Sequence, residues 1–373
     1  MEKKPTIVDI AKALGLSTAT VHRALHDHPK TTAMTKNRVL QMAKKLGYKP
    51  NLAARYLSSK RTIRISVNTL QGTTSFWDEV RAGIEQERQS LDLENVELEF
   101  RTYSLGEGEQ VAFEEALDKE VDGIITFPSQ PNTLKPLMRR AARANVPVVF
   151  VATDAPATGR LSVVSIDTQA SGSLAADLIG RIVGGRGELA VTIFDADINE
   201  HAEKFRAFED TVRSLYPSMR VHDAIEDHDT DETAYEQCRK LLSKHPDIVG
   251  IYVTTELSIP VIKAARDLHL LPKLTIVTTD LFPALVNEIR SGAVTATIYQ
   301  RPRTQGRMAF RVLHEFLVEA ECPPPQLTLA PHLVMRGNLE FFLQRELLSH
   351  SGDEQFESDK EYAGNAVAGL RGD

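Results

Sequence analysis

Apolar residues recur with helical spacing near the start of the chain. Between residues 6 and 14 they fall at i, i+3, i+4 and i+7, on one face of a helix: Ile7, Ile10, Ala11 and Leu14. Thr6 is the predicted N-cap of this helix. A second amphipathic helix is predicted from Ser17, its own N-cap, to Leu25. The pattern therefore predicts two short helices joined by a turn at Gly15-Leu16.

The second helix divides its residues between a buried stripe and an outer face. Val21, Ala24 and Leu25 form the predicted stripe. The outer face starts with small residues and ends with a long one: Thr18, Ala19, His22 and Arg23. Small residues let a helix approach the floor of a DNA groove, and an Arg can reach a base edge. This predicts a helix-turn-helix; the alternative is a pair of amphipathic helices without DNA contact, which soluble proteins often form.

A third helix is predicted over Thr35–Leu46, capped by its first residue. Its core face is formed by Val39, Met42, Ala43 and Leu46. Pro50 then interrupts the chain, and the helix-compatible segment Asn51–Leu57 has only about two turns, too few to be stable alone. We therefore predict an all-α head at residues 1–50, followed by a hinge and linker at residues 51–62.

From Ile63 the pattern changes to short β-branched strands that alternate with helices. The predicted strands are 63–70, 96–103, 122–128, 146–152, 162–166, 188–194, a weak one at 221, 248–254, 275–279 and 295–300. The predicted helices start at Phe76, Glu109 and Ala170 or cover 134–144, 203–215, 232–243, 260–267 and 287–289. This alternation predicts an α/β body of two lobes with parallel sheets, over residues 63–344. Residues 345–373 are polar and acidic, without helical periodicity or leucine heptads, and are expected to be a disordered tail.

Charge separates the head from the body. Residues 1–64 carry 14 Lys and Arg against 3 Asp and Glu, a net +11, whereas the remainder carries 30 against 48, a net −18. A small basic segment on a large acidic body is typical of a polyanion-binding module. We therefore expect double-stranded DNA as the partner of the head.

Other sequence features bear on location and on metal binding. No apolar run approaches 18 residues, and the N-terminus lacks the apolar core of a signal peptide, so we expect a cytoplasmic protein without membrane contact. Cys238 and Cys322 lack metal-ligand spacing and are expected to be inert thiols. His26 and His28 have no carboxylate or Cys partner nearby. Neither a metal nor a cofactor is expected.

The segments TIVDIAKALGLSTATVHRAL and LGYKPNLAARYL resemble the DNA-binding head and hinge of the LacI/GalR family of bacterial transcription regulators. In that family the hinge folds into a helix when two subunits sit together on operator DNA, and a Leu from each enters the minor groove. The resemblance implies a homodimer on a palindromic operator. Its DNA-binding positions are Thr6, Ser17, Thr18, Ala19, Thr20, His22, Arg23, Asn51, Ala54, Arg55 and Leu57.

Two of these positions need comment. An apolar side chain such as that of Leu57 can insert between two base pairs. This costs the stacking energy of that step, but it bends the DNA so that the site contacts more of the protein. The alternative is that Leu57 packs against the body as an ordinary linker residue. His22 departs from the Ser usual at a position that contacts phosphate in the family, although an imidazole can also donate to phosphate.

The body, from Ile63 to about Phe342, resembles the two-lobed periplasmic sugar-binding proteins, which hold their ligand between the lobes. The LacI/GalR family carries the same kind of body. A sugar site needs aromatic faces and planar polar groups. The effector-binding candidates are Phe76, Trp77, Ser129, Asp154, Lys204, Thr255, Asp280 and Gln300.

Alternatives remain for the best of these candidates. Phe76 and Trp77 are adjacent at a helix start and cannot both face one core, which favours the cleft over core packing. Asp280 and Gln300 follow predicted strands, where open α/β sheets bind ligands. Asp280 as a helix cap before Phe282 is the alternative.

Other positions depart from the family pattern. Lys204 replaces the effector-binding Arg, a point charge in place of a planar fork, and Thr255 replaces an Asn. Ala152 replaces a first-lobe Asp, with Asp154 close by, and Phe127 stands at a position that is often polar. The resemblance therefore implies an unusual or charged carbohydrate, or a different small metabolite.

Three classes of function compete for this chain. An enzyme is not expected, because the chain has no G-x-S-x-G, P-loop, H-E-x-x-H or C-x-x-C motif. A solute-binding protein of a transport system would need a signal peptide and no basic head. The leading prediction is a dimeric DNA-binding repressor controlled by a small effector in the interlobe cleft. A regulator of the same architecture controlled by a protein partner is the alternative.

Overall fold

The computed structural model describes residues 7–25, 31–46, 62–71, 75–91, 93, 95–104, 107–196, 198–227 and 230–349. The chain forms two compact units, residues 1–63 with 314–323 and residues 64–313 with 324–373. Five predicted DNA-binding positions lie outside the described residues: Thr6, Asn51, Ala54, Arg55 and Leu57. The same holds for the predicted tail from residue 350 onward. No helix in the described part of the chain combines the length and apolar character that a membrane span requires.

The head contains three short helices, α1 (Ile7–Leu14), α2 (Thr18–Leu25) and α3 (Ala33–Leu46). They share one small core, formed by Ile10, Ala11, Val21, Ala24, Val39 and Ala43. Ser17 caps α2 as predicted, because its Oγ accepts the backbone N–H of Thr20 at 3.1 Å. The turn before α2 places Gly15 at a φ of +64°, where glycine meets no steric penalty.

Two details of α3 differ from the prediction. The cap is Thr32, whose Oγ1 accepts the backbone N–H of Thr35 at 3.3 Å, so the helix begins at Ala33. The apolar periodicity starts later than the helix, which is why Thr35 looked like its first residue. Leu46, predicted on the core face, is exposed because it lies in the last turn of the helix.

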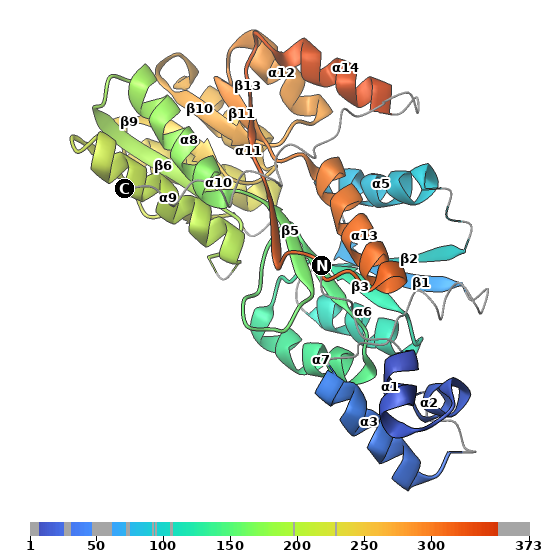
Figure 1. Cartoon of the computed structure of the whole chain (residues 1–373). Helices are drawn as coiled ribbons and strands as arrows, with labels where there is room; N and C mark the ends of the chain where they lie inside the picture. The colour runs from blue at the N-terminus through green and yellow to red at the C-terminus, as the bar shows by residue number, and fades with distance from the viewer. Residues whose placement is uncertain are drawn as a thin grey trace, which may run out of the picture. The chain divides into compact units, whose positions relative to one another are not determined.

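The first lobe is built on a six-stranded sheet in the order β12-β5-β4-β3-β1-β2. Its strands are β1 (Ile63–Leu70), β2 (Val96–Tyr103), β3 (Gly123–Thr126), β4 (Val148–Val151), β5 (Ser162–Ile166) and β12 (Gln326–Leu329). Helices α5 (Ser75–Ser90) and α13 (Pro302–Glu319) cover one face, and α6 (Glu107–Asp118) and α7 (Pro131–Ala144) the other (Figure 1).

The second lobe contains a seven-stranded sheet in the order β13-β11-β10-β9-β6-β7, with β8 also paired to β6. Its strands are β6 (Gly187–Ile193), β7 (Met219–Val221), β8 (Ile225–Glu226), β9 (Ile248–Val253), β10 (Thr275–Thr279), β11 (Ala296–Tyr299) and β13 (His332–Val334). Among the described strand pairs of this sheet, only the pair of β11 with β13 is antiparallel. Its helices are α8 (Thr168–Ile182), α9 (Asn199–Leu215), α10 (Asp231–Lys244), α11 (Ser258–Asp267), α12 (Pro283–Ser291) and α14 (Leu339–Ser349), with a 3-10 turn at Leu271–Lys273.

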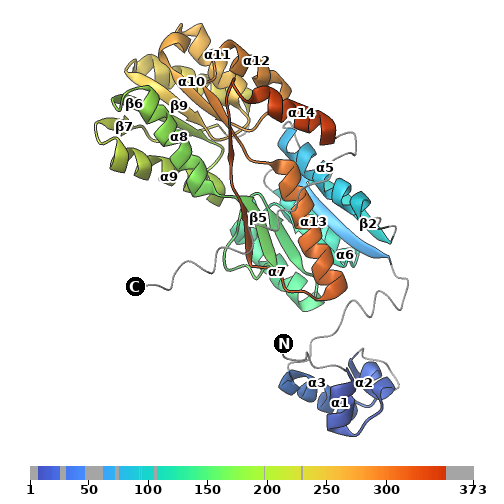
Figure 2. The ribbon, with the colours of Figure 1, turned by 45° about the horizontal axis from the view of Figure 1, so that its top comes forward.

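The chain passes between the lobes after β5, after β11 and after β12, as Figures 1 and 2 show. The sequence pattern predicted β1 to β7 and β9 to β11 but missed β8 and everything after Gln300: α13, β12, β13 and α14. Helix α14 continues to Ser349 and so extends past residue 344, the predicted end of the body. Strands β12 and β13 are short and lie at sheet edges, so their periodicity is weak. Helix α13 has 18 residues and buries apolar side chains such as Phe310 and Leu313, so its pattern was present in the sequence and was overlooked.

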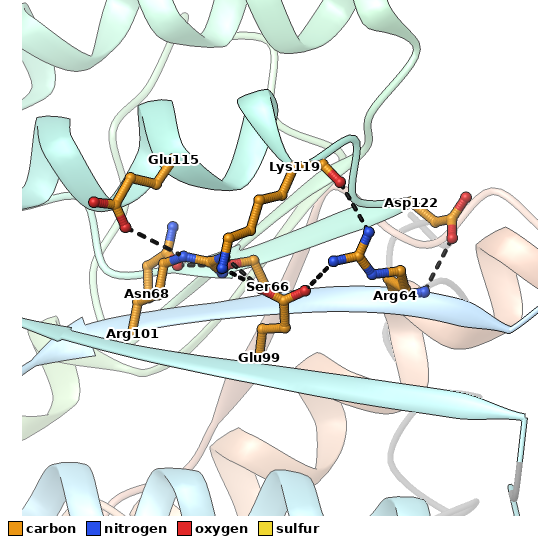
Figure 3. Close-up of polar contacts among 8 residues, drawn as sticks. All are labelled: Arg64, Ser66, Asn68, Glu99, Arg101, Glu115, Lys119 and Asp122. Carbon is orange, nitrogen blue, oxygen red and sulfur yellow. Dashed lines mark hydrogen bonds and ion pairs between the residues drawn. The ribbon is translucent and has the colours of Figure 1, made fainter.

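Strand β2 carries charged side chains on the face covered by α6, and these side chains form ion pairs. Glu99 and Arg101 on β2 pair with each other at 2.5 Å, and Arg64 on β1 also pairs with Glu99. Burial works to raise the pKa of Glu99, but hydrogen bonds from the two Arg side chains outweigh it and lower that pKa. Figure 3 shows this network, to which α6 adds Glu115 and the turn after α6 adds Lys119. The outer strand is therefore joined to α6 by ion pairs.

Helices α5 and α13 cross in close contact because both have glycine at the crossing. A Cβ at Gly83 would lie 2.1 Å from the carbonyl oxygen of Arg303, and one at Gly306 would lie 2.1 Å from that of Val80. We expect Gly306→Ala to lower the free energy of unfolding of the body by about 1–3 kcal/mol, since the backbones must separate. Chemical denaturation measures the change. Gly337→Ala is the control, because a Cβ there meets nothing within 4 Å; equal stability of both variants would contradict the prediction.

Candidate effector cleft and DNA-binding head

The body has a pocket to which both lobes contribute, at the carboxyl ends of their parallel strands. Eight of its lining residues are the last residue of a strand or the one directly after it: Leu70, Gln71, Phe127, Ala152, Phe194, Thr254, Asp280 and Gln300. The rest come from α5, from α9 and the residue before it, and from the segment after β9: Phe76, Trp77, Ile198, Glu200, His201, Thr255 and Glu256. We call these fifteen residues the cleft pocket. Its position is the one where open α/β sheets bind ligands.

Aromatic rings form the first-lobe side of the cleft pocket. Trp77 packs edge-on against Phe76 at 4.9 Å and against Phe127 at 4.8 Å between ring centroids. All three side chains are largely buried, yet each lines the pocket. Core packing and cleft lining are therefore not alternatives here, because the rings do both. The third ring is that of Phe127, which stands at a position that is often polar in the family.

Asp280 follows β10 and turns its carboxylate toward Gln300. Its Oδ1 accepts the backbone N–H of Gln300 at 3.2 Å, and its Oδ2 accepts the Nε2 amide at 2.7 Å. Burial and then the neighbouring Glu256 raise the pKa of Asp280 to about 8. The helix-cap alternative is wrong, because α12 begins after Phe282 and receives no side-chain cap.

The backbone is strained at two strand ends of the pocket. Ala152 has a φ of +71° and Asp280 a φ of +65°, a region that residues with a side chain rarely adopt. Such strain persists where the surrounding structure imposes it, and it gathers at functional sites. Both residues line the cleft pocket, which supports its role as a binding site.

Lys204 does not line the cleft pocket, contrary to its predicted place there. It is fully buried in α9, and its Nζ donates to Glu200 Oε1 at 2.5 Å and to Gln300 Oε1 at 2.8 Å. Burial works to lower the pKa of Lys204, but Glu200 outweighs this and raises it. The Glu-Lys spacing of four along α9 was a signal for this pair. Lys204 therefore orients the side-chain amide of Gln300 without lining the pocket itself.

Lys204 was the α9 residue predicted to line the pocket, but His201, one turn earlier on the same helix, lines it instead. Its Nδ1 lies 3.0 Å from the hydroxyl of Thr254. Burial lowers the pKa of His201 to about 4, so the ring is neutral near pH 7. The sequence did not single out this residue, because nothing in HAEKF shows which side of the helix meets the cleft.

Glu256 is a second pocket carboxylate that the prediction left out of the site. Its Oε1 accepts the hydroxyl of Ser75 at 2.9 Å and the backbone N–H of Phe76 at 3.1 Å, both in the first lobe. The adjacent Thr255 donates to Asp227 at 3.0 Å and also lines the pocket, as predicted for it. Glu256 thus joins the two lobes directly. Its position after a strand end, like that of Asp280, was the available signal.

Two further predicted effector residues lie outside the cleft pocket. Ser129 is buried and donates to Glu109 Oε2 at 2.6 Å. Asp154 forms a two-pronged ion pair with Arg160, at 2.5 and 2.6 Å, and lines a separate hollow. Both follow strands of the first lobe, but the chain has already turned away from the cleft at these positions.

The predicted DNA-binding residues of the head lie on and just before α2. Ser17 and Thr18 are exposed. Thr20 is half-buried, and its hydroxyl lies 2.8 Å from that of Ser17. Ala19, His22 and Arg23 belong to the same helix, and their side chains lie outside the described residues. The exposed start of α2 fits a recognition helix, and the DNA contacts themselves stay predictions.

One cluster in the second lobe has the chemistry of metal ligands. His222 Nε2 lies 2.6 Å from Glu188 Oε2, and His245 Nδ1 lies 3.8 Å from the same oxygen. All three ligand atoms lie within 4.8 Å of one another. The hydrogen bond from His222 is the largest contribution to the lowered pKa of Glu188. This hydrogen bond alone accounts for the close approach of the two side chains, so no metal is needed to explain it. None of these residues lines the cleft pocket.

A helix-turn-helix head followed in the chain by a two-lobed body of the periplasmic binding protein type defines a class of DNA-binding regulators. Residues 6–51 match the family model of the bacterial regulatory proteins of the lacI family, and residues 65–321 match that of the periplasmic binding protein domain. The chain belongs to the lacI family of bacterial regulators, with a body of the periplasmic binding protein class.

Relatives and solved structures agree with this assignment. Catabolite control protein A of Priestia megaterium is 27% identical over 266 residues, 70% of this chain and 77% of that protein. The Staphylococcus aureus (strain MRSA252) protein of the same name is 24% identical over 351 residues, 89% of this chain and 98% of that one. GanP, a glucose-galactose binding protein from Geobacillus stearothermophilus, has a TM-score of 0.70 at 25% identity and covers 75% of this chain and 99% of its own. A Burkholderia graminis solute-binding protein, solved with D-arabinose, shares the fold with a TM-score of 0.70 at 20% identity over 75% of this chain and 97% of that one.

Proposed function

We propose that the protein is a transcription repressor that binds a palindromic operator as a homodimer and is controlled by a carbohydrate or carbohydrate derivative in the cleft pocket. The observation that carries the proposal is the pocket itself, with aromatic rings from one lobe and polar strand ends from the other. The similarity of the body to a glucose-galactose binding protein supports a carbohydrate as the ligand. Because its target is chromosomal DNA, the proposal places the protein in the cytoplasm and gives it no catalytic role.

The proposed switch acts through the two lobes. A ligand that touches Trp77 in one lobe and Asp280 in the other favours one arrangement of the lobes. It can shift the equilibrium only by its difference in affinity for the two arrangements. In a dimer, a lobe movement changes the spacing of the two hinges at residues 51–62, and a hinge helix that is stable only as a docked pair responds by forming or melting.

Operator binding and its control can be measured together. We expect the affinity of the full chain for an operator, identified by selection from random DNA, to fall steeply with salt, because each neutralised phosphate releases counterions. A hundredfold loss of operator affinity on ligand binding corresponds to about 2.7 kcal/mol of coupling. Fluorescence anisotropy of labelled operator measures both effects, and Trp77, the only Trp of the chain, reports ligand binding.

The controls separate the parts of the proposal. Arg23→Ala is expected to reduce discrimination between operator and random DNA by about 1–3 kcal/mol, without changing the response of Trp77 to ligand. A flat salt dependence would contradict DNA binding by the basic head. An operator affinity that responds to a protein partner and to no small molecule would replace the proposed effector.

A further inference from the structure

The charged groups of the cleft pocket are all acidic. Three carboxylates line it, Glu200, Glu256 and Asp280, and no Lys or Arg does so among the described residues. The one imidazole of the lining, His201, is neutral near pH 7 because burial lowers its pKa to about 4. The pocket therefore presents negative charge in a partly dehydrated space, where electrostatic interactions are strong.

Glu200 and Glu256 already have partners. Lys204 donates to Glu200 at 2.5 Å and to the amide oxygen of Gln300. Glu256 accepts hydrogen bonds from the hydroxyl of Ser75 and the backbone N–H of Phe76. Because Lys204 is fully buried and lies outside the lining, its ammonium is not available to a ligand. Near pH 7 Asp280 holds its proton, because its pKa is about 8. The negative charge that a ligand meets therefore comes from Glu256, and Asp280 becomes charged when a cation displaces its proton.

Asp280 shows the effect of this arrangement. The donors that its carboxylate receives from Gln300, a backbone N–H and a side-chain amide, are neutral. Burial and the nearby Glu256 make its charged form costly, which is why its pKa is raised to about 8. A positive charge placed between these two carboxylates would reverse that cost. A negative charge would increase it.

The aromatic rings of the pocket suit the same kind of ligand. Phe76, Trp77 and Phe127 line the first-lobe side, and Phe194 lines the second. The face of an aromatic ring attracts a cation within about 6 Å, most strongly for Trp. The same faces stack on the apolar side of a sugar ring. Rings and carboxylates together form a cage for a positively charged polyol.

We infer that the effector of this protein is a small cation, a carbohydrate-like molecule with a protonated amine, which Asp280 and Glu256 bind while the aromatic rings pack on its ring. Sugar phosphates and uronic acids are expected to bind more weakly, because their negative charge would lie near Glu256. This inference rests on the proposed function of the pocket as the effector site.

The test compares matched sugars that differ only in charge. The full chain is titrated at pH 7 with glucosamine, galactosamine and mannosamine, with their N-acetyl forms, with their neutral parents and with the 6-phosphates of those neutral parents, using Trp77 fluorescence and calorimetry. At least one amine is expected to bind tenfold or more tightly than its parent and its N-acetyl form. Binding should release protons, because the ammonium lowers the pKa of Asp280, and calorimetry in buffers of different ionisation enthalpy counts them.

Variants identify the groups responsible. Glu256→Gln and Asp280→Asn are each expected to weaken amine binding tenfold or more, and Asp280→Asn should also abolish the proton release. Asp210→Asn, which removes an exposed carboxylate from α9 outside the pocket, should change neither. Operator binding by the same variants reports whether they fold, and the Glu256 variant keeps the test valid if the Asp280 variant does not.

Two results would overturn the inference, and they differ in what they leave standing. A neutral or phosphorylated sugar that binds as tightly as the amines, and weakens operator binding, removes the cation but keeps the effector switch. Failure of every amine in the panel also removes the cation. If no sugar of any charge then alters operator affinity, the proposed carbohydrate effector fails with it.

Discussion

Replacing Lys204 with methionine is expected to lower the free energy of unfolding of the body by about 3–5 kcal/mol. Methionine keeps the length of the side chain but leaves Glu200 buried without its partner, at 7% exposure. An uncompensated buried charge is far more costly than the loss of an exposed ion pair. The substitution also removes the donor that orients the amide of Gln300 toward Asp280, so ligand binding should weaken as well.

Denaturation followed by the fluorescence of Trp77 reports on the body alone, because the head has no Trp. The matched control is the double variant Glu200→Gln/Lys204→Met, which removes both charges. Replacing a buried ion pair as a whole is often close to neutral, so the double variant should regain much of the lost stability. A double variant less stable than Lys204→Met would show that the pair is not the cause.

The stability of the body is expected to fall between about pH 4 and pH 8 relative to that of the Asp280→Asn variant. The folded protein holds the Asp280 proton up to a pKa of about 8, whereas the unfolded chain releases it near 3.8. A group with a raised folded pKa stabilises the protein below its unfolded pKa, and this contribution is lost as the pH rises through the folded value. One proton limits the slope to about 1.4 kcal/mol per pH unit.

His201 acts in the opposite direction over part of this range. Its folded pKa of about 4 lies below the usual 6.5, so its contribution to stability is present above pH 6.5 and is lost as the pH falls toward 4. The two effects oppose each other below pH 6.5, and the decline due to Asp280 should be clearest between pH 6.5 and 8. Urea denaturation of both proteins across this range measures it. Parallel curves for wild type and Asp280→Asn would contradict the raised pKa.

The sequence predicted the elements of the fold well where a local pattern was strong. The core of the head follows from apolar spacing and from the Ser17 cap, and β1 to β7 follow from β-branched runs between turn residues. The prediction failed after Gln300, where α13 and β12 return to the first lobe and β13 and α14 belong to the second. Short strands at a sheet edge bury few apolar side chains and therefore leave little periodicity to detect.

Some residues of the candidate site could be predicted from the sequence, and others were identified only by the structure. Trp77, Asp280 and Gln300 were found because aromatic and polar residues at strand ends or helix starts point to a cleft. Lys204 and His201 lie one turn apart on α9, and no local feature of the sequence shows which of them faces the ligand. That choice depends on how α9 packs against its sheet. Glu256 was passed over because its hydrogen-bond partners lie about 180 residues away in the chain.

The sequence by itself determined the class of this protein: a basic helix-turn-helix head of the lacI family type and a two-lobed α/β body. These depend on spacing, composition and charge, which are local properties of the chain. The tertiary structure decided the character of the pocket, because only folding brings Asp280 and Glu256 together and hides Lys204 behind Gln300. A charge acts on a ligand through distance and burial, and the sequence specifies neither until the strands and helices of both lobes have packed.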